Sequence, residues 1–109
     1  MNGVRATVDF DTNVEHPKMK GVVDGYNAGH KFEWADFETS GTHYYGDGRR
    51  HYAGETIKVV IAFPFWRYFG SKVSVGDRFE IFEGSRLVGH GVVEETVSDV
   101  CGTPERVAK

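Results

Sequence analysis

The sequence is short of three things, and each shortage excludes a class of protein. Cys101 is its one cysteine, so a framework of intrachain disulfides is excluded and a reducing compartment fits. No apolar run approaches the roughly 18 residues that a membrane span needs, so no membrane association is expected. Positive charge is scarce too, since 13 Lys and Arg face 16 Asp and Glu, for a formal net charge of −3 at pH 7. Dedicated nucleic-acid binders usually carry a strongly basic surface, so DNA is not expected as a partner.

Length and composition bound the fold. The 109 residues suit one domain with a single core. Residues 1–10 alternate polar and apolar side chains and lack the apolar block of a secretory signal, so we expect a soluble cytoplasmic protein. Proline is rare at 3 residues, whereas glycine reaches 14 and aromatics 14%. Glycine permits tight turns and aromatics favour pleated surfaces, which together predict short strands.

Apolar side chains recur with a period of two in several segments, and no stretch of useful length has a helical period. The clearest strand predictions are residues 4–10 and 56–65, with Pro64 weakening the pairing near the end of the second. Further predicted strands are residues 31–37, 79–82 and 87–97, one that ends at Tyr44 and Tyr45, and one that begins at His51 and Tyr52.

Glycines indicate where these strands turn and where the backbone is closely approached. Residues 83–86 fit a hairpin turn with Gly84 at its first central position. Gly89 and Gly91 alternate within the strand that follows, which indicates a close approach of the backbone. Short strands with such turns fit a barrel or a sandwich, and we predict an all-β fold, a single closed antiparallel barrel of about six strands. It would span residues 1–97, with a flexible tail at residues 98–109.

One hairpin carries a family resemblance. Residues 76–93 read G-D-R-F-E-I-F-E-G-S-R-L-V-G-H-G-V-V. This resembles the closing hairpin of the C-terminal β-barrel domain of bacterial elongation factor Tu, G-L-R-F-A-I-R-E-G-G-R-T-V-G-A-G-V-V. Weaker similarities lie upstream in the same order, at residues 53–60 and 25–32, so the resemblance covers most of residues 4–97. It implies the third domain of that factor as a free-standing chain. No G-x-x-x-x-G-K-[ST] phosphate loop is present, so no GTPase activity is implied.

The resemblance also implies candidate RNA-binding positions. The family grips the T-stem of aminoacyl-tRNA through this barrel, and the matching positions are Glu83, Gly84, Ser85, Ser40 and His30. Backbone N–H groups and small hydroxyls can meet phosphates and 2′-hydroxyls without reading sequence. The alternative is that residues 83–85 simply make a hairpin turn.

A basic-aromatic cluster follows from composition rather than resemblance. Residues 43–52 interleave His and Tyr with Arg49 and Arg50. Such a mixture can stack bases and neutralise phosphates, so both arginines are candidate RNA contacts. The alternative is a solvated loop.

An aromatic loop is the main candidate for binding a protein. Residues 63–69 hold five aromatics in seven residues, and strand alternation cannot point all of them inward. Those left on the surface would form an apolar patch, which usually marks a partner site. The predicted partner-binding residues are Phe65, Trp66, Arg67, Tyr68 and Phe69. The alternative is a core strand covered by the chain itself.

The sequence has only weak patterns for catalysis or for metal binding. His43 and His51, with Asp47 between them, could meet across a hairpin, but a structural zinc site needs four ligands. No nucleophile turn is recognisable, so neither a cofactor nor an enzyme is predicted. We predict a non-enzymatic binding module for a protein partner, with structured RNA as the alternative and a homo-oligomer left open. A small enzyme or ligand carrier with a site at the barrel mouth is the alternative from another class.

Overall fold

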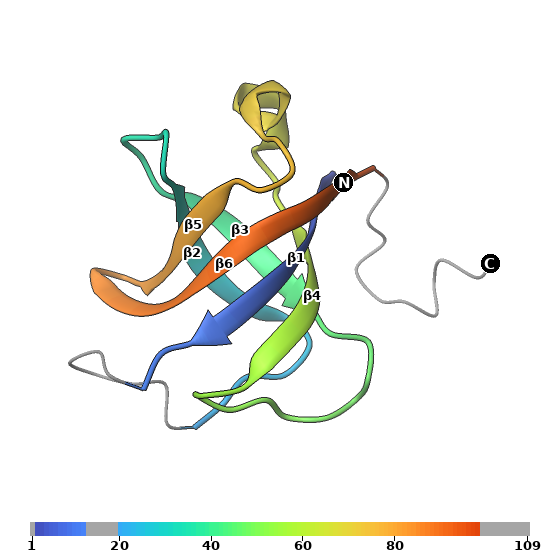
Figure 1. Cartoon of the computed structure of the whole chain (residues 1–109), viewed down its shortest axis with the longest axis vertical. Helices are drawn as coiled ribbons and strands as arrows, with labels where there is room; N and C mark the ends of the chain where they lie inside the picture. Colours follow the sequence, from blue (N-terminus) through green and yellow to red (C-terminus); the bar gives the residue numbers. More distant parts are fainter. Residues whose placement is uncertain (1, 13–19, 99–109) are drawn as a thin grey trace.

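The strands of the computed structural model close on themselves as an antiparallel barrel (Figure 1). The structure describes residues 2–12 and 20–98. The strands are β1 (Gly3–Phe10), β2 (Tyr26–Phe32), β3 (Thr39–Tyr44), β4 (Thr56–Ala62), β5 (Arg78–Glu83) and β6 (Arg86–Val97). Their order around the barrel is β1-β4-β3-β2-β5-β6, and β6 pairs with β1 to close it. The predicted all-β fold and closed six-stranded barrel are confirmed. No helix among the described residues is long and apolar enough to cross a membrane.

β1 shows why the period of two was informative. Val4, Ala6, Val8 and Phe10 point into the barrel and are almost completely buried, whereas Arg5 is exposed. The strand pairs with β4 on one side and with β6 on the other, so both of its edges are satisfied. Core side chains fill the barrel, so its interior is packed.

The β5–β6 hairpin has the predicted turn and the predicted close approach. Gly84 adopts a positive φ of 63°, which a glycine reaches without strain. A Cβ on Gly91 would collide with the ring of Phe79, and one on Gly89 would lie 2.5 Å from the carbonyl oxygen of Asp9. Both positions therefore need glycine to let neighbouring groups pack against the backbone.

Two strand predictions were wrong. Residues 31–37 do not form a strand, because β2 begins at Tyr26 and ends at Phe32. There the chain turns, with the Ala35 N–H donating to the Phe32 carbonyl at 3.0 Å. The strand predicted to begin at His51 is a single bridge to Val22.

The long predicted strand stops early for a chemical reason. β4 ends at Ala62 instead of Phe65. Pro64 has no N–H to give to a ladder, so the pairing cannot continue through it. The predicted tail lies outside the described residues, apart from Ser98.

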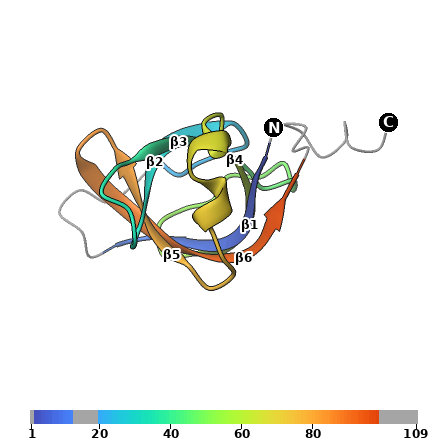
Figure 2. The ribbon, with the colours of Figure 1, turned by 90° about the horizontal axis from the view of Figure 1, so that it is seen from above.

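Antiparallel order places the connections at two opposite ends of the barrel (Figures 1 and 2). We call one the aromatic end, made of residues 33–38 between β2 and β3 and residues 63–77 between β4 and β5. We call the other the ionic end, made of residues 20–25, residues 45–55 between β3 and β4, and the turn of the β5–β6 hairpin. The aromatic loop therefore lies at one end, and the RNA candidates Arg49, Arg50 and residues 83–85 lie at the other.

Candidate functional site

The aromatic end is built on two short 3₁₀ turns, Trp66–Tyr68 and Gly70–Lys72. The first begins where the Trp66 N–H donates to the Phe63 carbonyl at 3.2 Å, directly after Pro64. Gly70 is required in the second, because a Cβ there would collide with the Trp66 indole. The turns project from the barrel as the yellow coil in Figure 1.

The aromatic loop divides into an exposed pair and a buried base. Phe65 and Tyr68 are 54% and 72% exposed, and their ring centroids lie 6.4 Å apart. The Arg67 guanidinium lies 5.2 Å from the centroid of the Tyr68 ring. Phe69 is only 3% exposed, so its assignment as a partner-binding residue was wrong: it packs in the core. Trp66 is partly buried against the same core.

A second exposed pair joins this surface, and the sequence interpretation missed it. Trp34 and Phe37 are 38% and 42% exposed, with ring centroids 6.5 Å apart. Phe37 contacts Phe69 at a centroid distance of 6.2 Å, and Phe69 contacts Trp66 at 5.5 Å. The Trp34 indole also donates to Asp77 Oδ2 at 3.0 Å, which ties residues 33–38 to the β4–β5 connection. The sequence held a sign that residues 31–37 are not a regular strand, because apolar and charged side chains are mixed on both faces of the predicted strand.

Together these four rings form a substantial surface. A whole aromatic side chain presents about 150–250 Å². At the observed exposures, the four leave roughly 400 Å² of aromatic surface in solvent. Patches of this size on a folded domain are often functional.

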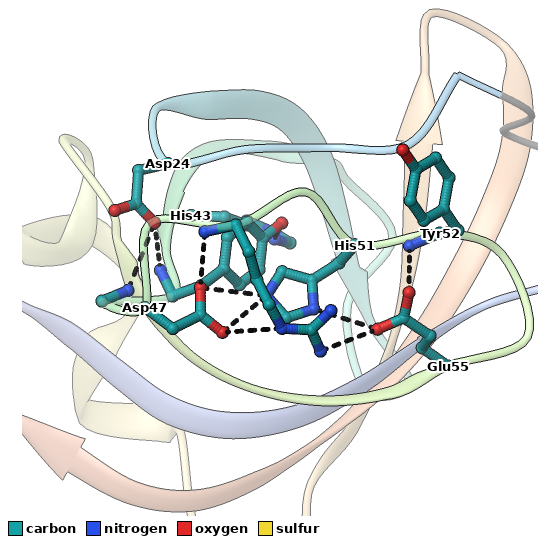
Figure 3. A network of polar contacts seen from close by, with 9 residues as sticks. Asp24, His43, Asp47, His51, Tyr52 and Glu55 are labelled. Carbon is teal, nitrogen blue, oxygen red and sulfur yellow. Dashed lines mark hydrogen bonds and ion pairs between the residues drawn. The ribbon is translucent and has the colours of Figure 1, made fainter.

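The ionic end is organised around His51, which is almost completely buried (Figure 3). Its Nε2 lies 2.9 Å from Asp47 Oδ2, and its Nδ1 lies 3.1 Å from Glu55 Oε1. The backbone N–H of Arg49 lowers the pKa of Asp47, and His51 lowers it further. The backbone N–H of Tyr52 does the same for Glu55, followed by His51. Both carboxylates are held charged against the imidazole.

This network uses the cations that were candidate RNA contacts. Arg49 pairs with Glu55 at 3.2 Å and with Asp47 at 3.7 Å. The Arg50 guanidinium donates to the Lys20 carbonyl at 3.0 Å. The charge of Arg49 is therefore compensated by carboxylates within the loop, whereas Arg50 contacts a neutral carbonyl.

The remaining RNA candidates on the surface lie around the β2–β5 pair. Gly84 and Ser85 are exposed at the hairpin turn, and Glu83 accepts hydrogen bonds from Tyr26 at 2.6 Å and Arg86 at 2.5 Å. Exposed Ser40 stands in another strand, β3. Its register partner Gly29 pairs in turn with Phe82, so β2 separates Ser40 from the hairpin.

His30 was wrongly assigned as a surface contact. It is fully buried, and its Nε2 lies 2.8 Å from Nε2 of His43, which is also fully buried. Gly41 makes room for the pair, since a Cβ there would lie 2.8 Å from His30 Cε1. His43 Nδ1 contacts the Tyr45 hydroxyl at 3.0 Å. Burial lowers the pKa of His30 to about 4 and that of His43 well below its usual value, so both are neutral at pH 7.

The suggested site at the barrel mouth is not assembled as expected. Asp47 and His51 meet, but His43 turns inward to His30 and Tyr45. Among the described residues, no group of three or more His, Cys, Asp or Glu side chains is arranged to hold a metal. A groove of about 560 Å³ lies instead on the outer face of β1, β2, β5 and β6. Lys31, Glu80, His90 and Asp9 line it in register across those strands.

No protein-family model matches the chain, and no characterised protein matches its sequence. The resemblance of residues 76–93 to the third domain of elongation factor Tu stays a prediction.

Proposed function

We propose that this chain is a non-enzymatic binding module that holds a protein partner on its aromatic end. The observation that carries the proposal is that two exposed ring couples, Phe65 with Tyr68 and Trp34 with Phe37, lie at the same end of the barrel. Rings held this way lose little conformational freedom on binding, and Trp, Tyr and Arg are the commonest anchors of protein interfaces.

Charge favours a protein over RNA. Proteins that stack bases combine aromatics with a positively charged groove. Two arginines of the ionic end, Arg49 and Arg86, pair with carboxylates. Residues 33–38 carry three acidic residues and no basic one, and residues 63–77 carry Asp77 beside Arg67 and Lys72. The resemblance to a translation factor domain leaves a partner in the translation machinery as the alternative to other proteins.

The test is capture of a partner from native lysate by tagged wild type and by a folded Phe65→Ala, Tyr68→Ala variant. A matched control is Tyr52→Ala, since Tyr52 is 47% exposed at the ionic end. We expect the same protein with wild type and the control, retained after ribonuclease and lost from the double variant. Capture of RNA, or a partner that ribonuclease removes, would overturn the proposal in favour of RNA binding. A protein that the double variant still captures would place the binding surface elsewhere.

A further inference from the structure

Charged side chains around the aromatic end are segregated by sign. Glu33, Asp36 and Glu38 are exposed on the β2–β3 connection, which we call the acidic loop (residues 33–38). Arg67 and Lys72 are exposed on the 3₁₀ turns, which we call the basic segment (residues 66–72). Both views place the acidic loop beside the basic segment at this end of the barrel (Figures 1 and 2).

None of these five side chains forms an ion pair with another described residue, although Lys31 lies beside the acidic loop, where its ammonium donates to the Ala35 carbonyl at 2.8 Å. Other surface charges are paired, for example Lys58 with Glu94 at 2.6 Å and Arg5 with Glu95 at 3.2 Å. The aromatic end has apolar rings, with acidic residues on one loop and basic residues on the other. It is complementary to a surface that places basic residues opposite its acidic loop and acidic residues opposite its basic segment. A two-fold copy of the same end has that layout.

We infer that the partner held at the aromatic end is a second copy of this chain, docked end to end about a two-fold axis. The acidic loop of each copy faces the basic segment of the other, and the exposed rings meet at the centre. The inference rests on the proposed function, because it names the partner of the same surface. In such an isologous contact each complementary pairing occurs twice.

The size and position of the surface fit this arrangement. A standard interface buries about 800 Å² per partner, and its centre is apolar with a polar rim. The roughly 400 Å² of exposed aromatic surface would supply the centre, and the acidic loop and basic segment would supply the rim. The closed barrel leaves no free sheet edge, so two copies cannot join by strand pairing and must use loop side chains.

The test is sedimentation velocity over a range of concentrations with two matched charge reversals. One variant carries Glu33→Lys and Asp36→Lys, and the other carries Arg67→Glu and Lys72→Glu. We expect wild type to dimerise, and each variant alone to dimerise at least about tenfold more weakly, because like charges then face each other. An equimolar mixture of the two variants should recover the dimer, because both contacts become attractive again.

A second pair of samples excludes unspecific attraction between oppositely charged proteins. Adding Phe65→Ala and Tyr68→Ala to both charge variants should abolish dimer formation in the mixture. A mixture that still associates would overturn the end-to-end geometry, and so would a wild-type dimer that neither reversal weakens.

The inference can fail separately from the proposed function. A wild-type chain that stays monomeric up to high concentration overturns self-association. If Phe65 and Tyr68 are still needed to capture another protein, the binding module stands with a different partner. Binding of that monomer to anionic lipid vesicles, lost in the Phe65→Ala, Tyr68→Ala variant, would overturn both in favour of a membrane surface.

Discussion

His30 and His43 face each other inside the barrel through their Nε2 atoms, 2.8 Å apart, and both rings are completely buried. One shared proton satisfies this contact, whereas a second proton would set two N–H groups against each other in a fully buried site. The surrounding groups cannot relieve the charge. Tyr26 and Tyr45 flank His43, and burial raises the pKa of both phenols, so they stay neutral.

We predict that acid destabilises the barrel through this pair. The folded-state pKa of His30, about 4, lies below the usual 6.5, so the unfolded chain binds more protons between these values. Stability is therefore fully present above about pH 6.5 and is lost as pH falls toward about 4, with a slope approaching about 1.4 kcal/mol per pH unit for each proton. Urea denaturation at several pH values measures this slope.

A His43→Gln variant is the control for the acid effect. Glutamine keeps a hydrogen-bonding group beside His30 but cannot titrate, so the slope should become shallower even if the variant is less stable overall. Asp47 and Glu55, whose pKa values are lowered, still lose stability at lower pH, so some acid dependence remains. An unchanged slope in the variant would show that the histidine pair does not cause the acid sensitivity.

Substitutions at Phe69 should lower the stability of the fold, whereas substitutions at Phe65 and Tyr68 should weaken partner binding and leave stability almost unchanged. Phe69→Ala removes a ring packed against Phe32, Phe63 and Trp66, and should cost about 3–5 kcal/mol. The Phe65→Ala, Tyr68→Ala variant removes exposed rings and should change the free energy of unfolding by about 1 kcal/mol or less. Chemical denaturation measures both. If Phe69→Ala fails to fold, Phe69→Leu gives a smaller loss in the same direction, and a neutral Phe69→Leu would contradict its supporting role.

Alternation predicted the parts of the fold that local sequence controls. β1 and the β5–β6 hairpin were found because their side chains alternate and a glycine marks the turn. The acidic loop was mistaken for a strand, because Trp34 stacks on Phe32 after the chain has left the sheet. A loop of aromatic residues that covers a barrel end has a composition like that of a strand, so composition alone does not distinguish the two.

The two histidine clusters differ in how far apart their residues lie in the sequence. His51 reaches Asp47 and Glu55, each four positions away, so spacing alone could have found that network. The His30–His43 pair depends on the register of β2 against β3 and on the space left at Gly41. Register between strands cannot be read from either strand alone, so the burial of His30, which the resemblance made an RNA candidate, was not predicted.

His51 is predicted to hold the β3–β4 connection in place. Its backbone exchanges two hydrogen bonds with Val22, at 2.8 and 2.9 Å, and its ring is held between Asp47 and Glu55. In His51→Ala the two carboxylates lose their shared partner and the loop loosens. Hydrogen exchange followed by NMR should show faster exchange at the amides of residues 22 and 51, with β5 and β6 unchanged. Equal protection of those two amides in wild type and variant would show that the ring does not hold the loop.

A substitution at Gly91 tests whether the glycines of the β5–β6 hairpin, which carries the family resemblance, are needed for packing. A methyl group on Gly91 would overlap the Phe79 ring, which is itself 1% exposed and cannot move into solvent. Gly91→Ala should therefore destabilise the barrel by about 1–3 kcal/mol, the usual range for an overpacked core. The matched suppressor is Phe79→Leu, whose smaller side chain leaves room for the methyl group. The double variant should lose less than the two single losses combined, because both changes act on the same contact. Additive losses would mean that contact with the Phe79 ring does not explain why residue 91 is glycine.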